Sequence, residues 1–201
     1  MKKVYHSALK DPLMIEQEMN MWSDGINLAM RADIRKLDLW VENNNRLYED
    51  YYSHCDVYYT EPSWLDGYEK FMDRADQERY SFEEYLLHLH RLVKECIRPL
   101  WMVIGTHALK QLPKPDRLEK IKLHGYHTNL VGWNDQQEYS FTDNYDFIRQ
   151  LAEKYNCVGD FNCGYGNTGR IFKESGKKFI MSDINGKCIY YIAKTLMGYE
   201  G

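Results

Sequence analysis

The chain has 201 residues, a formal net charge of −4 and 44% hydrophobic residues. This length predicts a single domain, residues 1–201, that can bury a proper core. The negative charge argues against nonspecific binding of nucleic acid over an extended surface. It is compatible with a local basic face. No apolar run reaches the roughly eighteen residues of a membrane span, and no apolar stretch follows the two N-terminal lysines. We therefore expect neither a membrane segment nor a signal peptide.

The cysteine content favours a reducing compartment. Five cysteines are an odd number, and no two of them form a C-x-x-C pair. Reduced thiols in a cytoplasmic protein account for this pattern, and we expect no zinc or other metal site. The five are Cys55, Cys96, Cys157, Cys163 and Cys188.

The N-terminal third is predicted to form an arm, a helix and one strand. Residues 1–20 are expected to be an irregular or helical arm that Pro12 breaks. Apolar residues at mixed three- and four-residue spacing predict a helix over 22–45. Residues 55–60 (C-D-V-Y-Y-T) are rich in β-formers and predict a strand, which the tetrapeptide E-P-S-W follows directly. The polar stretch 65–80 then predicts a mobile loop near the site.

The middle of the chain is predicted to alternate helices and strands. The pattern Ser81-x-x-Glu84 predicts a capped helix start, and residues 100–104 predict a buried strand. Residues 125–133 alternate enough to predict an antiparallel edge strand. Residues 144–155 then predict a helix, with Thr142 or Asp143 as its N-cap.

The most basic stretch of the chain covers residues 110–122 and contains two prolines. Its cations could follow a phosphate backbone, and a solvated connection between elements explains them equally well. On the first interpretation, the phosphate contacts are Lys114, Arg117 and Lys120.

The C-terminal region has the pattern of a nucleoside-binding crevice. A short apolar run over 155–161 precedes a glycine-rich turn, and a predicted helix follows over 168–174. A second apolar run, 178–181, leads to Asp183, seventeen positions after Gly166. Glycines let the backbone approach a ligand closely, and an acid at the next strand end can accept ribose hydroxyls. The alternative is a strand-to-helix turn without a ligand.

The position of this pattern in the chain favours a permuted fold. Only eighteen residues follow Asp183, enough for one helix over 186–196. A dinucleotide-binding domain needs several strands after its glycine turn, so the pattern argues against an NAD enzyme. We expect the remaining strands of the sheet to come from upstream.

The same region resembles a known family. The sequence D-F-N-C-G-Y-G-N-T-G, with G-K-K-F-I-M-S-D-I-N after it, resembles the D-P-F-C-G-S-G-T-T-G and G-R-x-F-I-G-x-D-I-N motifs of S-adenosylmethionine-dependent amino methyltransferases of DNA. The family's proline and phenylalanine are replaced here by Phe161 and Asn162. The residues that match are Asp160, Cys163, Gly164, Gly166, Thr168, Gly169 and Asp183.

The resemblance implies an α/β, Rossmann-like methyltransferase fold. Its sheet would be mixed and mostly parallel with helices on both faces, and its order would be permuted, with the catalytic tetrapeptide before the cofactor turn. S-adenosylmethionine would lie over the glycine turn with its ribose on Asp183, and residues 140–143 would touch the methionine carboxylate. The implied cofactor-binding residues are Asp160, Phe161, Asn162, Cys163, Gly164, Gly166, Asp183, Phe141 and Thr142.

The tetrapeptide carries the second part of the resemblance. E-P-S-W resembles the family's D-P-P-W or D-P-P-Y. An exocyclic base amine is a poor nucleophile, because its lone pair is delocalised into the ring. Glu61 and the carbonyl of Pro62 would accept its two N–H bonds, and Trp64 would stack on the flipped base. Ser63 and Tyr68 are expected to bind the substrate.

Two residues of the tetrapeptide depart from the family pattern. Glutamate replaces aspartate, and Ser63 replaces the second proline. A carboxylate longer by one methylene could misplace its oxygen by about 1 Å, which can cost on the order of 10²-fold in rate. In the heterodimeric N6-adenosine methyltransferases, a comparable change marks the subunit that does not catalyse.

The predicted function is methyl transfer from S-adenosylmethionine to N6 of adenine in DNA, with N4 of cytosine second. One alternative is a catalytically silent relative that binds nucleic acid or an active partner. Another is methylation of RNA or a free nucleotide. DNA is the expected partner, and a homodimer or a methyltransferase-like partner subunit is compatible with the pattern. The resemblance also implies an origin in phage or mobile elements.

Overall fold

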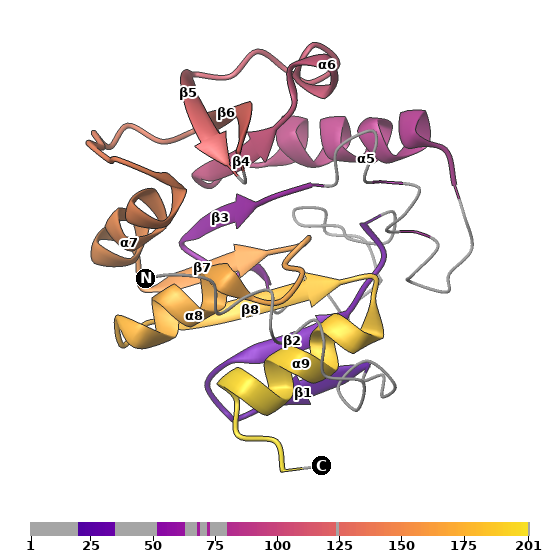
Figure 1. Cartoon of the computed structure of the whole chain (residues 1–201), viewed down its shortest axis with the longest axis vertical. Helices are drawn as coiled ribbons and strands as arrows, with labels where there is room; N and C mark the ends of the chain where they lie inside the picture. Colours follow the sequence, from indigo (N-terminus) through magenta and orange to yellow (C-terminus); the bar gives the residue numbers. More distant parts are fainter. Residues whose placement is uncertain are drawn as a thin grey trace.

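The computed structural model describes residues 20–34, 52–62, 68, 72, 80–123 and 125–200 (Figure 1). The predicted N-terminal arm and most of the predicted loop over 65–80 lie outside these residues, as does the segment 35–51. The C-terminal region with its glycine turn is described without a break.

Eight strands form one sheet in the described part of the chain. They are β1 Met21–Ser23, β2 Leu28–Arg31, β3 Val57–Thr60, β4 Leu100–Ile104, β5 Arg117–Leu123, β6 Tyr126–Trp133, β7 Cys157–Asp160 and β8 Lys178–Asp183. Their order across the sheet is β1-β2-β8-β7-β3-β4-β6-β5. The inner strands β2, β8, β7, β3 and β4 are parallel, whereas β1 and β6 run antiparallel to their neighbours. The predicted mixed, mostly parallel sheet is therefore confirmed.

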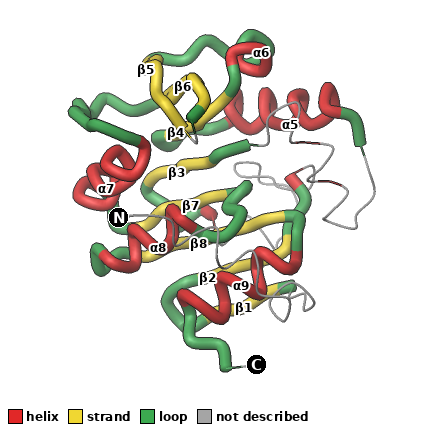
Figure 2. Tube along the Cα trace, viewed as in Figure 1, coloured by secondary structure: helices red, strands yellow, loops and turns green. Residues whose placement is uncertain are grey.

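Helices cover both faces of the sheet (Figure 2). The described helices are α5 Phe82–Glu95, α6 Thr106–Leu109, α7 Asn144–Lys154, α8 Asn167–Glu174 and α9 Gly186–Leu196. On one face, Leu89 and Leu92 of α5 belong to a buried core that also contains Tyr58 of β3 and Met102 of β4. On the other face, α7, α8 and α9 pack against the strands and form a second core with Tyr59.

Side-chain caps fix the starts of two helices, as the sequence predicts. Ser81 Oγ accepts a hydrogen bond from the Glu84 N–H at 3.0 Å, which begins α5. Asp143 Oδ1 accepts one from the Asp146 N–H at 2.8 Å, so Asp143 rather than Thr142 caps α7.

The prediction of a helix over 22–45 is wrong for residues 22–31. Residues 21–23 and 28–31 form the strands β1 and β2, joined by a turn in which Asp24 Oδ1 accepts the N–H groups of Ile26 and Asn27. Leu28, Ala29 and Met30 are buried in the two cores of the sheet. A short apolar run of this kind fits a buried strand as well as a helix.

Two further predictions need correction at the far edge of the sheet. The strand predicted at the edge, β6, lies between β4 and β5, and β5 is the outer strand. The basic stretch 110–122 is therefore not a connection throughout, because its last residues belong to β5. Lysine and glutamate side chains on an outer strand are a common protection against pairing with another chain.

Candidate functional site

The carboxyl ends of the parallel strands bring the predicted site residues to one edge of the sheet. Asp183 ends β8, Asp160 ends β7, and Glu61 directly follows β3. These three strands are neighbours or next neighbours in the sheet. In open α/β sheets, ligands bind beyond the carboxyl ends of the strands. The structure thus assembles residues that are far apart in the sequence.

The glycine turn after β7 has the backbone that its glycines permit. Gly164 and Gly166 have φ values of 50° and 77°, in the left-handed region that other residues rarely adopt. A Cβ at Gly166 would lie 2.8 Å from Ile192, whereas one at Gly164 would meet no described atom within 4 Å. Gly166 therefore lets α8 pack on α9, and at Gly164 no described atom fills the space that a side chain would take.

Asp183 joins the turn to the end of β8. Its Oδ2 accepts the N–H of Gly164 at 2.8 Å, and its Oδ1 accepts the N–H of Asn185 at 2.9 Å. Burial raises the pKa of Asp183 to about 6, although both hydrogen bonds act to lower it. A carboxylate offers about four acceptor positions, so each oxygen retains one for a further donor.

Asp160 is the more deeply perturbed acid. Burial raises its pKa to about 8, and the charges of Glu61 and Asp183 add to that shift. Hydrogen bonds from Thr168 and from the Asn162 N–H act in the opposite direction. Asp160 is therefore mostly protonated at neutral pH, and it lies within electrostatic range of both other acids.

Glu61 is bound from two sides through one oxygen. Its Oε1 accepts the Tyr59 hydroxyl at 2.7 Å and the Asn144 amide at 2.8 Å. Tyr59 belongs to β3 and Asn144 begins α7, so the strand and the helix together hold the side chain. Pro62 is buried beside it, whereas Ser63 and Trp64 lie outside the described residues.

Asn162 is hydrogen-bonded to residues on both sides of the glycine turn. Its Oδ1 accepts the Tyr85 hydroxyl at 3.1 Å, and its Nδ2 donates to Thr60 Oγ1 at 3.2 Å. Phe161 is buried in the core that α5 covers, and Cys163 in the core on the opposite face. Asn162 thereby connects the glycine turn to β3 and α5.

Tyr68 lies close to this connection. Its hydroxyl donates to the carbonyl of Tyr80 at 2.8 Å, and its ring centroid is 5.1 Å from that of Tyr85. Tyr68, Tyr85 and Phe161 line a small cavity of about 20 Å³, which has room for about one water molecule. The side chain is thus placed near the turn, and a substrate contact by it stays a prediction.

Phe141 and Thr142 lie just ahead of α7. The Phe141 ring packs on Phe147, with 5.0 Å between centroids, and the Thr142 N–H donates to Asp146 Oδ2 at 3.0 Å. Asn144, two residues later, is the one that contacts Glu61. The segment therefore lies next to the residue that binds Glu61. A contact with the methionine carboxylate stays a prediction.

The three basic candidates lie on or before β5 and do not join this cluster. Arg117 forms an ion pair with Glu138 at 2.8 Å, and Lys120 Nζ donates to Asn129 Oδ1 at 2.5 Å. Lys114 lies in the segment before β5. Because β4 and β6 separate β5 from β3, the strands are roughly 14 Å apart in the sheet.

Four residues of the cluster were not identified from the sequence. Tyr59 and Asn144 bind Glu61, and Tyr85 binds Asn162. Asn167 opens α8 directly after the glycine turn, and its buried Oδ1 has no hydrogen-bond partner among the described residues. Strand alternation places Tyr59 on the same face as Glu61, so that residue was detectable. Asn144 and Tyr85 come from distant elements, whereas Asn167 lies within the glycine-turn motif itself.

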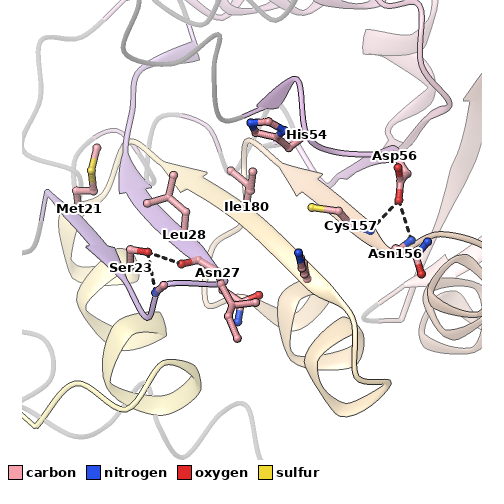
Figure 3. Close-up of a pocket in the computed structure, with 12 residues that line it drawn as sticks. Met21, Ser23, Asn27, Leu28, His54, Asp56, Asn156, Cys157 and Ile180 are labelled. Atoms are coloured by element: carbon pink, nitrogen blue, oxygen red, sulfur yellow. Dashed lines mark hydrogen bonds between the residues drawn. The ribbon is translucent and has the colours of Figure 1, made fainter.

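A larger cavity lies at the opposite, amino-terminal edge of the sheet (Figure 3). It has a volume of about 620 Å³, and Leu28, Cys157 and Ile180 form part of its wall. Asp56 Oδ2 accepts the N–H groups of Asn156 and Cys157 there. None of the predicted site residues that the structure describes lines this cavity.

Comparison with known proteins places the fold. The structure of M1.HpyAVI superposes with a TM-score of 0.52 over 85% of this chain and 98% of that chain, at 11% sequence identity. A complex of M1.HpyAVI with SAM matches with a TM-score of 0.45, over 74% of this chain and 94% of that chain at 12% identity. The architecture shared with the first structure confirms the predicted Rossmann-like methyltransferase fold.

TTHA0409 from Thermus thermophilus, proposed to be a DNA modification methylase, also matches. Its TM-score is 0.45 at 14% identity, over 72% of this chain and 88% of that chain. No protein family profile and no curated protein matches the sequence. Within the described residues, no helix is long and apolar enough to cross a membrane.

Proposed function

We propose that this protein transfers a methyl group from S-adenosylmethionine to an exocyclic amine of a base in DNA, with N6 of adenine preferred over N4 of cytosine. One observation carries the proposal. Glu61 after β3, the glycine turn after β7 and Asp183 after β8 converge at the carboxyl edge of one sheet. These are the three parts that the reaction requires, and the fold is shared with M1.HpyAVI.

The cofactor would be held by the turn and the strand end beside it. No described atom occupies the space beside Gly164, and Asp183 retains acceptor positions for ribose hydroxyls. The buried Oδ1 of Asn167, unpaired within the described part of the chain, adds an acceptor for a ligand donor at the same turn. M1.HpyAVI has been solved as a SAM complex. When bound, S-adenosylmethionine supplies an electrophilic methyl group on its sulfonium.

Glu61 and Pro62 would activate the target amine. A carboxylate and a carbonyl that accept both N–H bonds draw the nitrogen toward tetrahedral geometry and free its lone pair. The positive charge that develops on nitrogen strengthens the hydrogen bond to Glu61 as the reaction proceeds. The charge of Glu61 already acts on Asp160 of the turn, which supports a shared site.

The order of elements supports the permuted type of amino methyltransferase. The strand that leads to the cofactor turn, β7, comes late in the chain but lies beside β3 in the middle of the sheet. Glu61 therefore precedes the turn by about 100 residues and still meets it in space. A dinucleotide-binding enzyme begins with its glycine turn, so this order speaks against that class.

Mass spectrometry of genomic DNA from an expressing host tests the proposal. We expect N6-methyladenine or N4-methylcytosine above the level of a host that carries the empty vector. Glu61→Ala is the matched control, because it should bind cofactor and leave the genome unmethylated. No methylated base in the wild-type host would refute the proposal, provided that the protein accumulates in soluble form.

A catalytically silent relative is the competing function. Glu61, Ser63 and Asn162 all depart from the family pattern, and the Asn162 amide is engaged by Tyr85 and Thr60. Such a protein would bind S-adenosylhomocysteine and nucleic acid but transfer nothing. Methylated RNA or nucleotides with unmodified DNA would instead indicate the third alternative.

A further inference from the structure

The hydrogen bonds to Glu61 are unevenly distributed between its two oxygens. Oε1 accepts both the Tyr59 hydroxyl at 2.7 Å and the Asn144 amide at 2.8 Å. Oε2 accepts no hydrogen bond from the residues that the structure describes. A carboxylate held through one oxygen keeps the other available for a donor outside the protein.

The two donors are themselves fixed. Tyr59 is 0% exposed and Asn144 is 2% exposed. The Tyr59 hydroxyl lies 2.8 Å from Asn144 Oδ1, and its ring packs on Phe147 of α7 with 6.4 Å between centroids. The hydroxyl has one hydrogen for two acceptors, and the ionised carboxylate is the stronger acceptor. The clamp formed by Tyr59 and Asn144 therefore comes from two buried groups that support each other.

We infer that Tyr59 and Asn144 are positioning residues, which hold Glu61 by Oε1 and direct Oε2 toward the target amine. The inference rests on the proposed function. It accounts for a glutamate where the family has an aspartate. The extra methylene alone would let the carboxylate move by about 1 Å. Hydrogen-bond donors at fixed positions restrict the carboxylate to one position.

Removal of one hydroxyl tests the clamp. Tyr59→Phe should lower kcat for methyl transfer by roughly tenfold or more, because the carboxylate becomes loose. KM for DNA and affinity for S-adenosylhomocysteine should stay within about twofold, since both are governed by other contacts. The matched control is Tyr58→Phe on the same strand, equally buried, whose hydroxyl donates to the Tyr52 carbonyl. Equal losses in both variants would overturn the inference, as would a fully active Tyr59→Phe.

The pH dependence of kcat separates positioning from a structural role. Asn144→Asp places a second carboxyl group within hydrogen-bond distance of Glu61, and two such neighbours resist ionising together. The acid limb of the profile should move upward by about one pH unit. A variant that is merely misfolded would keep the wild-type profile at lower amplitude, and that result would contradict the inference.

A double-mutant cycle in urea unfolding decides whether the clamp exists even in an inactive protein. Tyr59→Phe and Glu61→Gln should be non-additive by at least about threefold in the unfolding equilibrium constant, because the two residues share a hydrogen bond. Additive effects would overturn the clamp. Coupling in a wild-type protein that binds cofactor but transfers no methyl group would leave the clamp standing and remove the proposed function.

Discussion

The carboxyl edge of the sheet and the outer strand β5 hold their ionisable side chains in different ways. At the carboxyl edge, Asp160 and Asp183 are 2% and 3% exposed and accept backbone N–H groups. On β5, Arg117 pairs with the exposed Glu138, and the exposed Lys120 donates to the buried Asn129. Buried acids cost free energy unless they are hydrogen-bonded, whereas surface pairs cost and contribute little. Substitutions at the first region should therefore have much larger effects.

The largest effect is expected at Glu61. Glu61→Ala should abolish methyl transfer, because it removes a hydrogen bond made chiefly in the transition state, and the loss should appear in kcat. Glu61→Asp should lose on the order of 10²-fold, since the clamp fits the longer acid. Steady-state assays on host genomic DNA measure both. A gain of activity in Glu61→Asp would show that the site is built for the shorter acid.

The second effect concerns the glycine turn. Gly164→Asp would add a side chain and a negative charge where the backbone faces open space, at a φ of 50° that disfavours any side chain. Calorimetry should show S-adenosylhomocysteine binding to the wild type and little to the variant. Gly176→Asp, also at positive φ but at the far end of α8, is the matched control and should bind normally. No wild-type binding at about 1 mM ligand would remove the cofactor assignment.

The third effect is a pH dependence of stability at Asp160. Its pKa rises from 3.8 unfolded to about 8 folded, so the folded state favours the protonated acid. The stability that this protonation contributes is full below about pH 4 and is lost as the pH rises through 8. Relative to Asp160→Asn, the wild type should lose on the order of a few kcal/mol of unfolding free energy between pH 5 and pH 8. Parallel curves for the two proteins would contradict this.

The fourth effect follows from Asp183 and is smaller. Asp183→Ala should weaken binding of S-adenosylhomocysteine by roughly 1–3 kcal/mol, because ribose hydroxyls lose a charged acceptor. The variant also frees the N–H of Gly164, so calorimetry should be accompanied by a thermal unfolding curve. Unchanged affinity in a folded variant would show that Asp183 stabilises the glycine turn and does not bind the ribose.

The smallest effect is expected at the outer edge. Alanine at Lys114, Arg117 and Lys120 should flatten the salt dependence of DNA binding by up to about one unit for each phosphate that is no longer neutralised. Arg117 and Lys120 already have partners, so each should change the slope of the salt dependence less than Lys114 does. An unchanged slope would show that these three side chains are solvated and contact no phosphate.

The elements that the sequence predicted well, α5, β4 and those from α7 onward, have local signals. The turn glycines, the buried runs and the caps at Ser81 and Asp143 each determine structure within a few residues. The β2 strand was missed because its partner β8 lies about 150 residues away in the chain. Nothing within Leu28–Arg31 distinguishes a buried strand from one side of a helix.

The candidate site divides in the same way. Asp183 could be proposed from the pattern of strand, glycine turn and acid, and Glu61 and Asp160 from the resemblance to the amino methyltransferase motifs. Asn144 could not, because its contact with Tyr59 spans 85 residues and depends on how α7 packs on the sheet. Tyr85 could not be proposed either, because it lies on α5 and is separated from Asn162 by 77 residues.

A single-turnover assay tests the central claim most directly. Wild-type protein in excess over labelled S-adenosylmethionine, mixed with genomic DNA from an unmodified host, should transfer label to N6 of adenine or N4 of cytosine. Glu61→Ala should bind the cofactor with unchanged affinity and transfer no label. If wild type and Glu61→Ala both bind cofactor normally and both leave the DNA unlabelled, the carboxyl edge is a binding site and the protein is a silent relative.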